Sequence, residues 1–232
     1  MMCRSRLSLV AIAFVIAGCS GGSNSGTDTD LALAAGQAVL DAVRTRGAGD
    51  GSAISVAPTR ADLDATPGQI LQVTPEDRGG TDFLQLIATR QDDFGRQVEV
   101  WQSSDKAHLI LRGGVLVGTK GLGGDIRSAE AGAATSGFDG TGGGGERIVV
   151  IDRTDGTAQT VAFSCDMTQL GTEVIQIVDQ RVTTRHMREE CATKNARFTN
   201  DYWVEPGRER VRKSRQWAGP RLGYYDMVLL KN

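Results

Sequence analysis

Beyond residue 68 the sequence consists largely of short runs in which apolar and polar residues alternate, and this pattern constrains the fold more than any other feature. Alternating runs of β-branched and aromatic residues, bounded by turn-forming residues, are typical of strands with one buried face. About twelve such runs are present, at residues 70–73, 83–89, 98–102, 108–111, 115–118, 147–151, 160–164, 174–178, 182–187, 198–205, 209–217 and 224–230. We therefore expect a mainly β fold in which the strands form an antiparallel meander.

Turn-forming residues separate these runs. The Gly113-Gly114 pair predicts a two-residue hairpin turn, because glycine enters both left-handed turn positions without strain. Asp155-Gly156 and Pro206-Gly207 predict further turns. The chain contains 30 glycines, and many of them lie shortly before or within the run at 142–145. We therefore expect a mobile glycine-rich loop near residues 130–146.

One amphipathic helix is expected before the strands. Apolar residues recur at helical spacing between Leu31 and Val43, Asp30 is a candidate N-cap, and Gly47 would end the helix. Packing on the protein's own sheet is favoured over a position on a membrane surface, because the polar face of this helix is poor in lysine. Residues 30–232 are therefore expected to form a single domain.

The first twenty residues indicate export and a lipid anchor. Arg4 and Arg6 precede an apolar run at 7–17, which has the order of an export signal but is too short to span a bilayer. The following Ala17-Gly18-Cys19 resembles a bacterial lipobox, which implies cleavage after residue 18 and lipidation of Cys19. Residues 19–29 would then be a lipidated cysteine and a flexible tether. A plain secretory signal is the alternative.

Cysteine usage agrees with export. Of the four cysteines, Cys3 would leave with the leader and Cys19 would carry lipid, so that Cys165 and Cys191 remain. In an oxidising compartment these two are expected to form a structural disulfide. A metal site is a weaker alternative, because the spacing lacks the close cysteine pairs of zinc sites.

A search for catalytic motifs returns negatives. After the expected lipobox and the glycines that follow it, the sequence contains no Gly-x-Ser-x-Gly elbow, no phosphate-binding Gly-Lys-Ser/Thr loop and no His-Glu-x-x-His, and the whole chain has two histidines. We expect no enzymatic activity, no cofactor and no metal. The formal net charge of −2 and the exported location also argue against nucleic acid as a partner.

A basic patch lies near the C-terminus, where six basic side chains and one acidic side chain stand between residues 207 and 221. In a strand, Arg210, Arg212 and Gln216 would share one face, whereas Arg215 and Trp217 would share the other. Two guanidinium groups on one side could bind the carboxylates or phosphates of an anionic polysaccharide bidentately. A solvated sheet face, or internal pairing with acidic neighbours, is the alternative.

The three tryptophans complete the tentative binding set. Trp101, Trp203 and Trp217 fall on separate expected strands. Positions as core or groove-lining anchors are favoured over platforms on which sugars stack.

Several blocks of sequence together resemble one family. They are Trp101-x-Ser103-x-Asp105 leading into Leu109, Gly114 and Leu116, then Tyr202-Trp203-Val204, Val211-x-x-Ser214-Arg215-Gln216 and a closing Met227-x-x-Leu230-Lys231. With the lipobox and the expected helix, these blocks resemble the YjbF/GfcB family of outer-membrane lipoproteins over most of the mature chain.

This resemblance implies both a fold and a context. The implied fold is an antiparallel β-structure curved into an open or half-barrel. The implied context is the production of exopolysaccharide or group 4 capsule, beside a periplasmic protein and an outer-membrane β-barrel lipoprotein of the same operon. The lipid anchor would lie at the periplasmic face of the outer membrane, because Ser20 stands where an aspartate would retain a lipoprotein at the inner membrane. No catalytic residue is implied.

Three functions follow as hypotheses. The first is a non-enzymatic accessory lipoprotein for polysaccharide production or export, which a solid core and a basic outer face would favour. The second is a lipid-binding half-barrel, which an apolar pocket of acyl-chain size would favour. The third is a polysaccharide-modifying hydrolase, which converging carboxylates in a polar cleft would favour.

Overall fold

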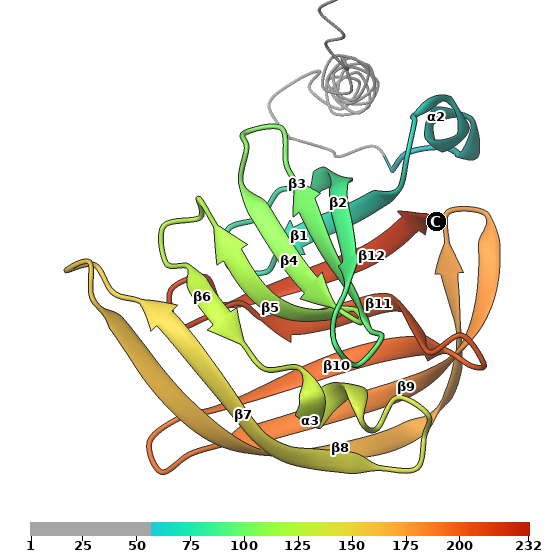
Figure 1. The fold of residues 1–232 in the computed structure, drawn as a ribbon. Coiled ribbons are helices and arrows are strands. Elements are labelled where there is room, and N and C mark those ends of the chain that lie inside the picture. Colours follow the sequence, from blue (N-terminus) through green and yellow to red (C-terminus); the bar gives the residue numbers. More distant parts are fainter. Residues whose placement is uncertain (1–56) are drawn as a thin grey trace, which may run out of the picture.

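Antiparallel strands make up most of the computed structural model, which describes residues 57–232 (Figure 1). The elements of this part of the chain are the helices α2 (Arg60–Ala65) and α3 (Gly132–Thr135) and the strands β1 (Ile70–Pro75), β2 (Asp82–Gln91), β3 (Gln97–Gln102), β4 (His108–Arg112), β5 (Val115–Lys120), β6 (Ile126–Ala129), β7 (Gly143–Asp152), β8 (Ala158–Ile177), β9 (Gln180–Ala192), β10 (Arg197–Glu205), β11 (Arg210–Trp217) and β12 (Tyr224–Lys231).

Part of the expected architecture falls before residue 57. The signal peptide at 1–18, the lipidated Cys19, the tether at 19–29 and the helix between residues 30 and 47 lie outside the described residues. From residue 57 to residue 232, neither helix has the length and apolar character that a membrane span requires.

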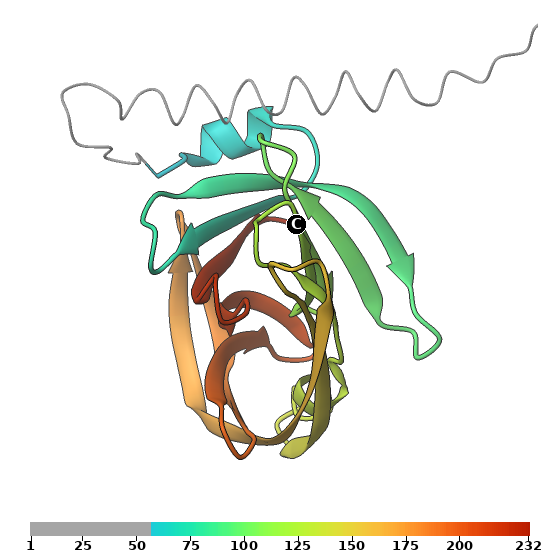
Figure 2. The same ribbon diagram turned by 90° about the vertical axis from the view of Figure 1, so that its left-hand side faces the viewer.

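The twelve strands belong to one sheet, in the order β5-β4-β3-β2-β1-β12-β11-β10-β9-β8-β7-β6. Neighbouring strands are antiparallel and mostly consecutive in sequence, so the expected antiparallel meander is confirmed. The pairing of β1 with β12 joins the beginning of the sheet to its end. The sheet then curls until its two edge strands, β5 and β6, approach each other, and it becomes a nearly closed barrel (Figure 2).

No backbone ladder pairs the two edge strands β5 and β6. Hydrogen bonds from side chains connect the two edges of the sheet instead. The Ile126 backbone N–H donates to the Thr119 hydroxyl oxygen over 3.0 Å, and that hydroxyl donates to Asp125 over 2.9 Å. Farther along the same edge, the Arg147 guanidinium donates to the Leu116 carbonyl over 3.0 Å. The barrel is therefore more closed than the open or half-barrel that the family resemblance implied.

The set of strands differs from expectation at two places. The runs expected at 160–164 and 174–178 are parts of one strand, β8, and the four-residue β6 was not expected. The middle of β8 is solvent-exposed on both faces, so it carries no alternating pattern. The hairpin turn at Gly113-Gly114 has the expected form, because both glycines have positive φ, at 56° and 82°.

The segment expected as a mobile loop near residues 130–146 contains α3 and the beginning of β7. Its glycines permit close approach of main chains. A Cβ on Gly143 would lie 2.8 Å from the Gly137 nitrogen, and a Cβ on Gly144 would lie 2.5 Å from the Cys165 carbonyl oxygen. Gly143 and Gly144 therefore serve close packing against β8 and the α3 segment, and residues 136–142 form the turn segment that joins α3 to β7.

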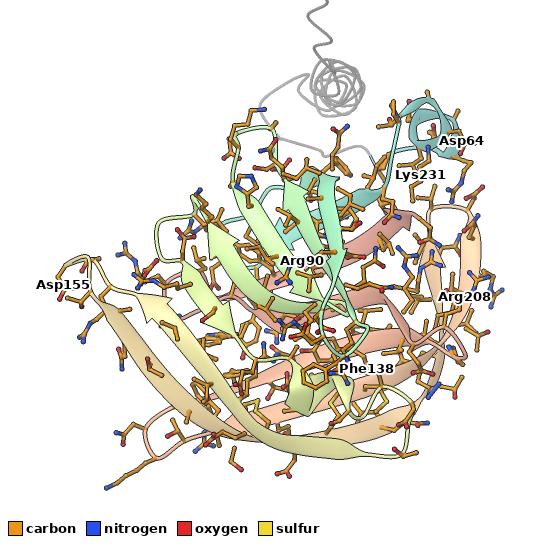
Figure 3. All side chains as sticks on the ribbon, in the orientation of Figure 1. Asp64, Arg90, Phe138, Asp155, Arg208 and Lys231 are labelled. Carbon is orange, nitrogen blue, oxygen red and sulfur yellow. A yellow bond between two sulfur atoms is a disulfide. The ribbon has the colours of Figure 1, made fainter. Side chains whose placement is uncertain are left out.

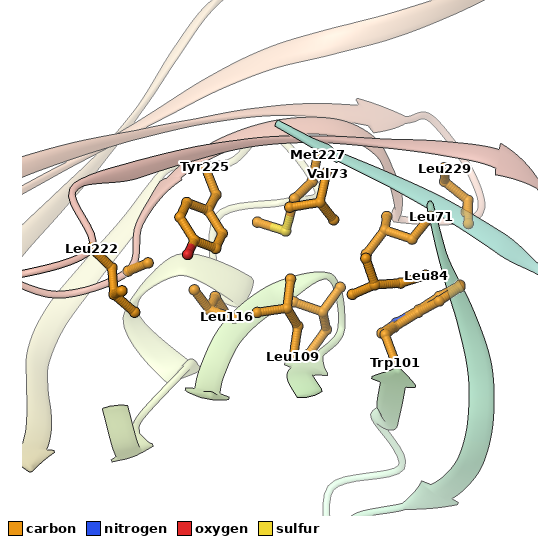
Figure 4. Close-up of a cluster of buried hydrophobic side chains, with 12 residues drawn as sticks. Leu71, Val73, Leu84, Trp101, Leu109, Leu116, Leu222, Tyr225, Met227 and Leu229 are labelled. Carbon is orange, nitrogen blue, oxygen red and sulfur yellow. The ribbon is translucent and has the colours of Figure 1, made fainter. Parts of the chain in front are cut away.

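Four clusters of buried hydrophobic side chains form the core. The first fills the space between β1–β5 and β11–β12, and Figure 4 shows its side chains converging from both sides. The second and third fill the barrel around α3, β7–β10 and the disulfide. Leu229 belongs to the first cluster and Leu230 to the fourth, so both faces of β12 are covered.

Helix α2 covers the outer face of this region. Thr59 and Asp62 form a capping box at its N-terminus, and the buried Leu63 packs in the fourth cluster. At the other end, the Lys231 ammonium donates to the carbonyls of Leu63 (2.9 Å) and Thr66 (2.7 Å). A cation at the C-terminal end of a helix is electrostatically favourable, so the last strand holds α2 in place.

The expected disulfide between Cys165 and Cys191 is confirmed. The two cysteines lie directly opposite each other in the β8–β9 ladder, with their Cα atoms 4.1 Å apart. Both side chains are buried. Glu189 lies close to both sulfur atoms, but sulfurs already bonded to each other do not offer thiolate ligands to a metal.

Candidate functional site

A cleft of about 640 Å³ lies between the β2–β3 hairpin and the body of the barrel. In Figure 2 this hairpin projects away from the barrel on the right of the view. The opposite wall is formed by the α3 segment and by the turn between β10 and β11, which carry Phe138 and Arg208 (Figure 3). The cleft is therefore built from segments that are far apart in sequence.

The floor of the cleft is apolar. It is formed by Leu71 of β1, Leu111 of β4, and Met227 and Leu229 of β12, all of which belong to the first core cluster. Trp101 of β3 closes one end and is fully buried. Side chains of this kind pack against the apolar faces of a ligand without fixing its orientation.

The walls of the cleft are charged. The basic residues that line it are Arg96, Arg208, Arg210, Arg212 and Lys213, and of these the Lys213 ammonium lies over the Trp203 ring. The acidic side chains that line it are Glu99, Asp139 and Glu209. The balance is positive, on a protein whose formal net charge is −2.

The acidic side chains have partners of their own. Glu209 pairs with Arg185 over 3.0 Å, and Arg185 does not line the cleft. Asp139 accepts hydrogen bonds from the Thr141 backbone N–H and hydroxyl, which lower the pKa of its carboxyl. Burial raises the pKa of Glu99 even though the Trp101 ring N–H donates to it over 3.1 Å. Because the acidic side chains are engaged in this way, the guanidinium groups are the main source of the electrostatic field in the cleft.

The four arginines differ in their exposure and in the hydrogen bonds and ion pairs that they form with the rest of the protein. Arg96 has no ion pair within the described residues, and Arg208 lies 3.9 Å from Glu205 with a side chain that is 71% exposed. Arg210 donates to the Gln69 side-chain oxygen over 3.2 Å. Arg212 is 7% exposed and donates to Glu205 over 3.0 Å, while its buried Nε has no partner between residues 57 and 232. Among residues 57–232, Arg208 and Arg96 are therefore the two of these arginines that other side chains engage least.

The β11 strand does not follow the strict alternation that was expected. Its register against β10 skips a residue at Arg212, so Val211 lies opposite Val204 and Lys213 lies opposite Trp203. This bulge directs Val211 toward the second core cluster. Arg210, Arg212 and Gln216 therefore do not form one continuous face.

Gln216 has a structural role in the barrel. It is fully buried, its amide nitrogen donates to the Gly114 carbonyl over 2.8 Å, and its oxygen accepts the Leu116 N–H over 2.7 Å. The side chain thus supplies hydrogen bonds to the open edge of β5. It does not line the cleft.

Three more residues of the tentative binding set lie outside the cleft lining, namely Arg215, Trp217 and Trp203. Arg215 binds both carboxylate oxygens of Glu76, at 2.5 and 2.7 Å, and stacks on the Tyr224 ring. Trp217 stacks on Phe198 with ring centroids 4.7 Å apart. For Arg215, the alternative of internal pairing with an acidic neighbour is the one observed.

Trp203 lies on the outer surface of the barrel wall rather than in the cleft. Its ring is stacked against His186, with centroids 4.4 Å apart, and Lys213 lies 4.4 Å from the ring centroid. Its ring N–H donates to Glu173 over 2.7 Å. Of the seven tentative binding residues, the cleft therefore brings together Trp101, Arg210 and Arg212.

The sequence reasoning missed Arg96, Arg208 and Glu99 as site residues. Arg208 belongs to the basic run that drew attention to the C-terminus, and its place in a turn was the available signal. Arg96 and Glu99 come from a hairpin more than a hundred residues earlier. No local pattern links them to that run.

A buried polar network lies inside the barrel beside the hydrophobic core clusters. The Arg147 guanidinium donates to Glu189 over 2.7 Å, and the Asn200 amide and Tyr202 hydroxyl donate to the same carboxylate oxygen over 2.7 and 3.0 Å. Burial and the adjacent carboxylate of Glu189 raise the pKa of Tyr202 well above its ordinary value. The network occupies interior space in which a hollow half-barrel would hold a lipid.

Comparisons with known proteins agree on family and fold. The family model described as group 4 capsule polysaccharide lipoprotein gfcB, YjbF, matches residues 39–230. A crystal structure of the hypothetical lipoprotein YmcC from Escherichia coli K12 superposes with a TM-score of 0.67 and 20% sequence identity. The match covers 91% of this chain and 98% of that one, and at this identity it supports the fold alone. No curated protein matches the chain.

Proposed function

Because the chain belongs to the YjbF family of group 4 capsule polysaccharide lipoproteins, we propose that it is a non-enzymatic accessory factor in the production or export of an extracellular polysaccharide. In this proposal, lipid on Cys19 holds the protein at the periplasmic face of the outer membrane. The basic cleft is the observation that carries the proposal, because it supplies a place where an acidic glycan can bind.

The chemistry of the cleft suits a sugar chain with carboxylate or phosphate groups. Arginine binds such groups through two parallel N–H donors, and Arg96 and Arg208 both line the cleft. The apolar floor can pack against the C–H faces of sugar rings, while the charged walls fix the acidic substituents. A passing chain would be held by charge and contact without any chemical change.

The family resemblance also suggests protein partners. We propose that the protein acts beside an outer-membrane β-barrel lipoprotein and a periplasmic protein encoded with it. Anchoring at the same membrane would raise the local concentration of such partners. The projecting β2–β3 hairpin, with Phe94 82% exposed at its turn, is available for contact with them.

The two alternative functions receive less support. A lipid-binding half-barrel needs an apolar cavity for an acyl chain, whereas the barrel here is packed with side chains and the cleft walls carry charges. A hydrolase would need free carboxylates facing one another. In this cleft, Glu209 is paired with Arg185, and Asp139 is held by Thr141.

Replacing Arg96 and Arg208 together with alanine tests the role of the cleft. Each exposed ion pair contributes about 0.2–1 kcal/mol, so the double variant should bind an acidic polysaccharide about two- to thirtyfold more weakly. Polysaccharide output from cells that carry the variant should fall. Binding is measured by titration of the purified full chain, and output by assay of the extracellular glycan.

The matched control replaces Arg153 and Arg197, which are exposed and lie outside the cleft lining, with alanine. This control changes the net charge equally and should bind and export as the natural protein does. Equal effects of the two double variants would show that general charge, and not the cleft, governs binding. Normal binding by the Arg96 and Arg208 variant would refute the cleft as the glycan site.

Replacing Cys19 with serine tests the anchor. Without the thiol no thioether lipid can form, so the protein should move from the membrane fraction to the soluble periplasmic fraction. Fractionation followed by immunoblotting measures the distribution. Persistence of the Cys19→Ser variant in the outer membrane would contradict lipidation at this residue.

A further inference from the structure

Strand β8 is longer than the strand beside it. The pairing of β7 with β8 ends where Gly143 lies opposite Met167. Beyond Met167, β8 continues to Ile177 and, among the strands of residues 57–232, pairs with β9 alone. Residues 168–177 therefore form an open sheet edge, which Figure 2 shows as the upright orange strand on the left of the view.

The main chain of this edge is suited to pair with another strand. The β8–β9 hairpin closes through a two-residue turn after Ile177. In an antiparallel ladder, alternate residues bond to the partner strand, and the residues between them direct their N–H and C=O groups to the other side. By this alternation Thr172, Val174 and Gln176 direct their main-chain groups to the open side. Such an edge is a template for strand addition.

The side chains of the edge are also exposed where a partner would cover them. Val174 is 52% exposed and Leu170 is 47% exposed, and together with Phe94 these are the large exposed hydrophobic side chains of residues 57–232. The opposite face of the hairpin is already covered, because Ile175 and Ile177 pack in the fourth core cluster with α2. One face and one edge are thus left for contact.

We propose that this edge pairs with the same edge of a second copy of the chain, forming a two-fold symmetric dimer with a continuous sheet. A two-fold axis at Val174 places each Val174 against its symmetry mate and Thr172 against Gln176 of the other copy. The one charged residue between 171 and 177 is Glu173, and it would lie opposite Ile175. The segment is therefore complementary to itself in this register.

The position of Glu173 supports this register. Its carboxylate accepts hydrogen bonds from the Trp203 ring N–H (2.7 Å) and the His186 ring (2.8 Å), which hold it over β9 and β10. These bonds also lower the pKa of its carboxyl, so it remains charged and directed away from the open edge. A register centred on Glu173 itself would oppose two carboxylates and is disfavoured.

Matched lysine variants of the full chain test the dimer. Val174→Lys would remove the Val174 pair and place two ammonium groups face to face at the axis, so the dissociation constant of the dimer should rise about two- to thirtyfold. Thr183 lies opposite Val174 on β9 and is exposed. In Thr183→Lys the two charges would stand about 15 Å apart, beyond a Debye length of about 8 Å, so the dimer should persist. Light scattering of the detergent-extracted protein, corrected for bound detergent, distinguishes the mass of one mature chain from that of two.

Cysteine variants test the same contact in intact cells. With copper phenanthroline as oxidant, two Val174→Cys thiols should lose two electrons and two protons and form one disulfide between copies. Thr183→Cys should form none, because its thiols lie too far apart. A non-reducing gel measures the covalent dimer. A monomeric natural protein, or equal behaviour of the variants at positions 174 and 183, would overturn the proposal.

Discussion

Replacing Arg147 with methionine is expected to lower the free energy of unfolding by about 3–5 kcal/mol. The Arg147 and Glu189 side chains are 3% and 0% exposed, and their atoms approach to 2.7 Å. Removing the guanidinium leaves a buried carboxylate without a cation and removes the hydrogen bond to the Leu116 carbonyl. Urea unfolding followed by circular dichroism measures the loss.

The control for this prediction is a double-mutant cycle. Glu189→Gln keeps an oxygen that accepts from Asn200 and Tyr202 but leaves the buried Arg147 guanidinium without its carboxylate, so it should also lower the free energy of unfolding by about 3–5 kcal/mol. In the double variant no unpaired charge is buried. Its loss of unfolding free energy should therefore be clearly smaller than the sum of the losses of the two single variants. Additive losses would show that the two charges do not interact.

Replacing both Cys165 and Cys191 with alanine is expected to lower the free energy of unfolding by about 3.5 kcal/mol. The bond closes a loop with a sequence separation of 26, and its loss gives the unfolded chain more conformational freedom. Both side chains are buried in the third core cluster, so small cavities add to the loss. Chemical unfolding without reductant measures the difference from the natural protein.

Reductant provides the control. It should destabilise the natural protein, whose disulfide it opens, and leave the double-alanine variant unchanged. The cleft lies away from these cysteines, so glycan binding by the folded variant should be retained. Equal stability of the natural protein with and without reductant would contradict a stabilising role for this bond.

Much of the fold could be read from local sequence pattern. Alternation of apolar and polar residues marked most strands, and Gly113-Gly114 marked a hairpin turn, because both signals depend on residues close together in the chain. The cysteine pair was predictable by elimination. The short β6 and the exposed middle of β8 gave no such signal, since neither has an alternating burial pattern.

The candidate site was predictable only in part. A run of basic residues pointed to Arg210 and Arg212, which do line the cleft. The same run contains Arg215, which is committed to Glu76, a residue far away in sequence. Whether a charged side chain is free or paired depends on what the fold places beside it, and alternation along β11 also failed at the bulge.

By itself, the sequence determined that this is a β-rich meander with one disulfide, because strand period, turn residues and cysteine count act locally or by counting. Only the tertiary structure decided that the sheet closes nearly into a barrel, that glycines near residue 143 serve close packing, and that Arg96 and Arg208 line the same cleft. Each of these depends on the contact of segments distant in the chain, which is set by the curvature and register of the whole sheet.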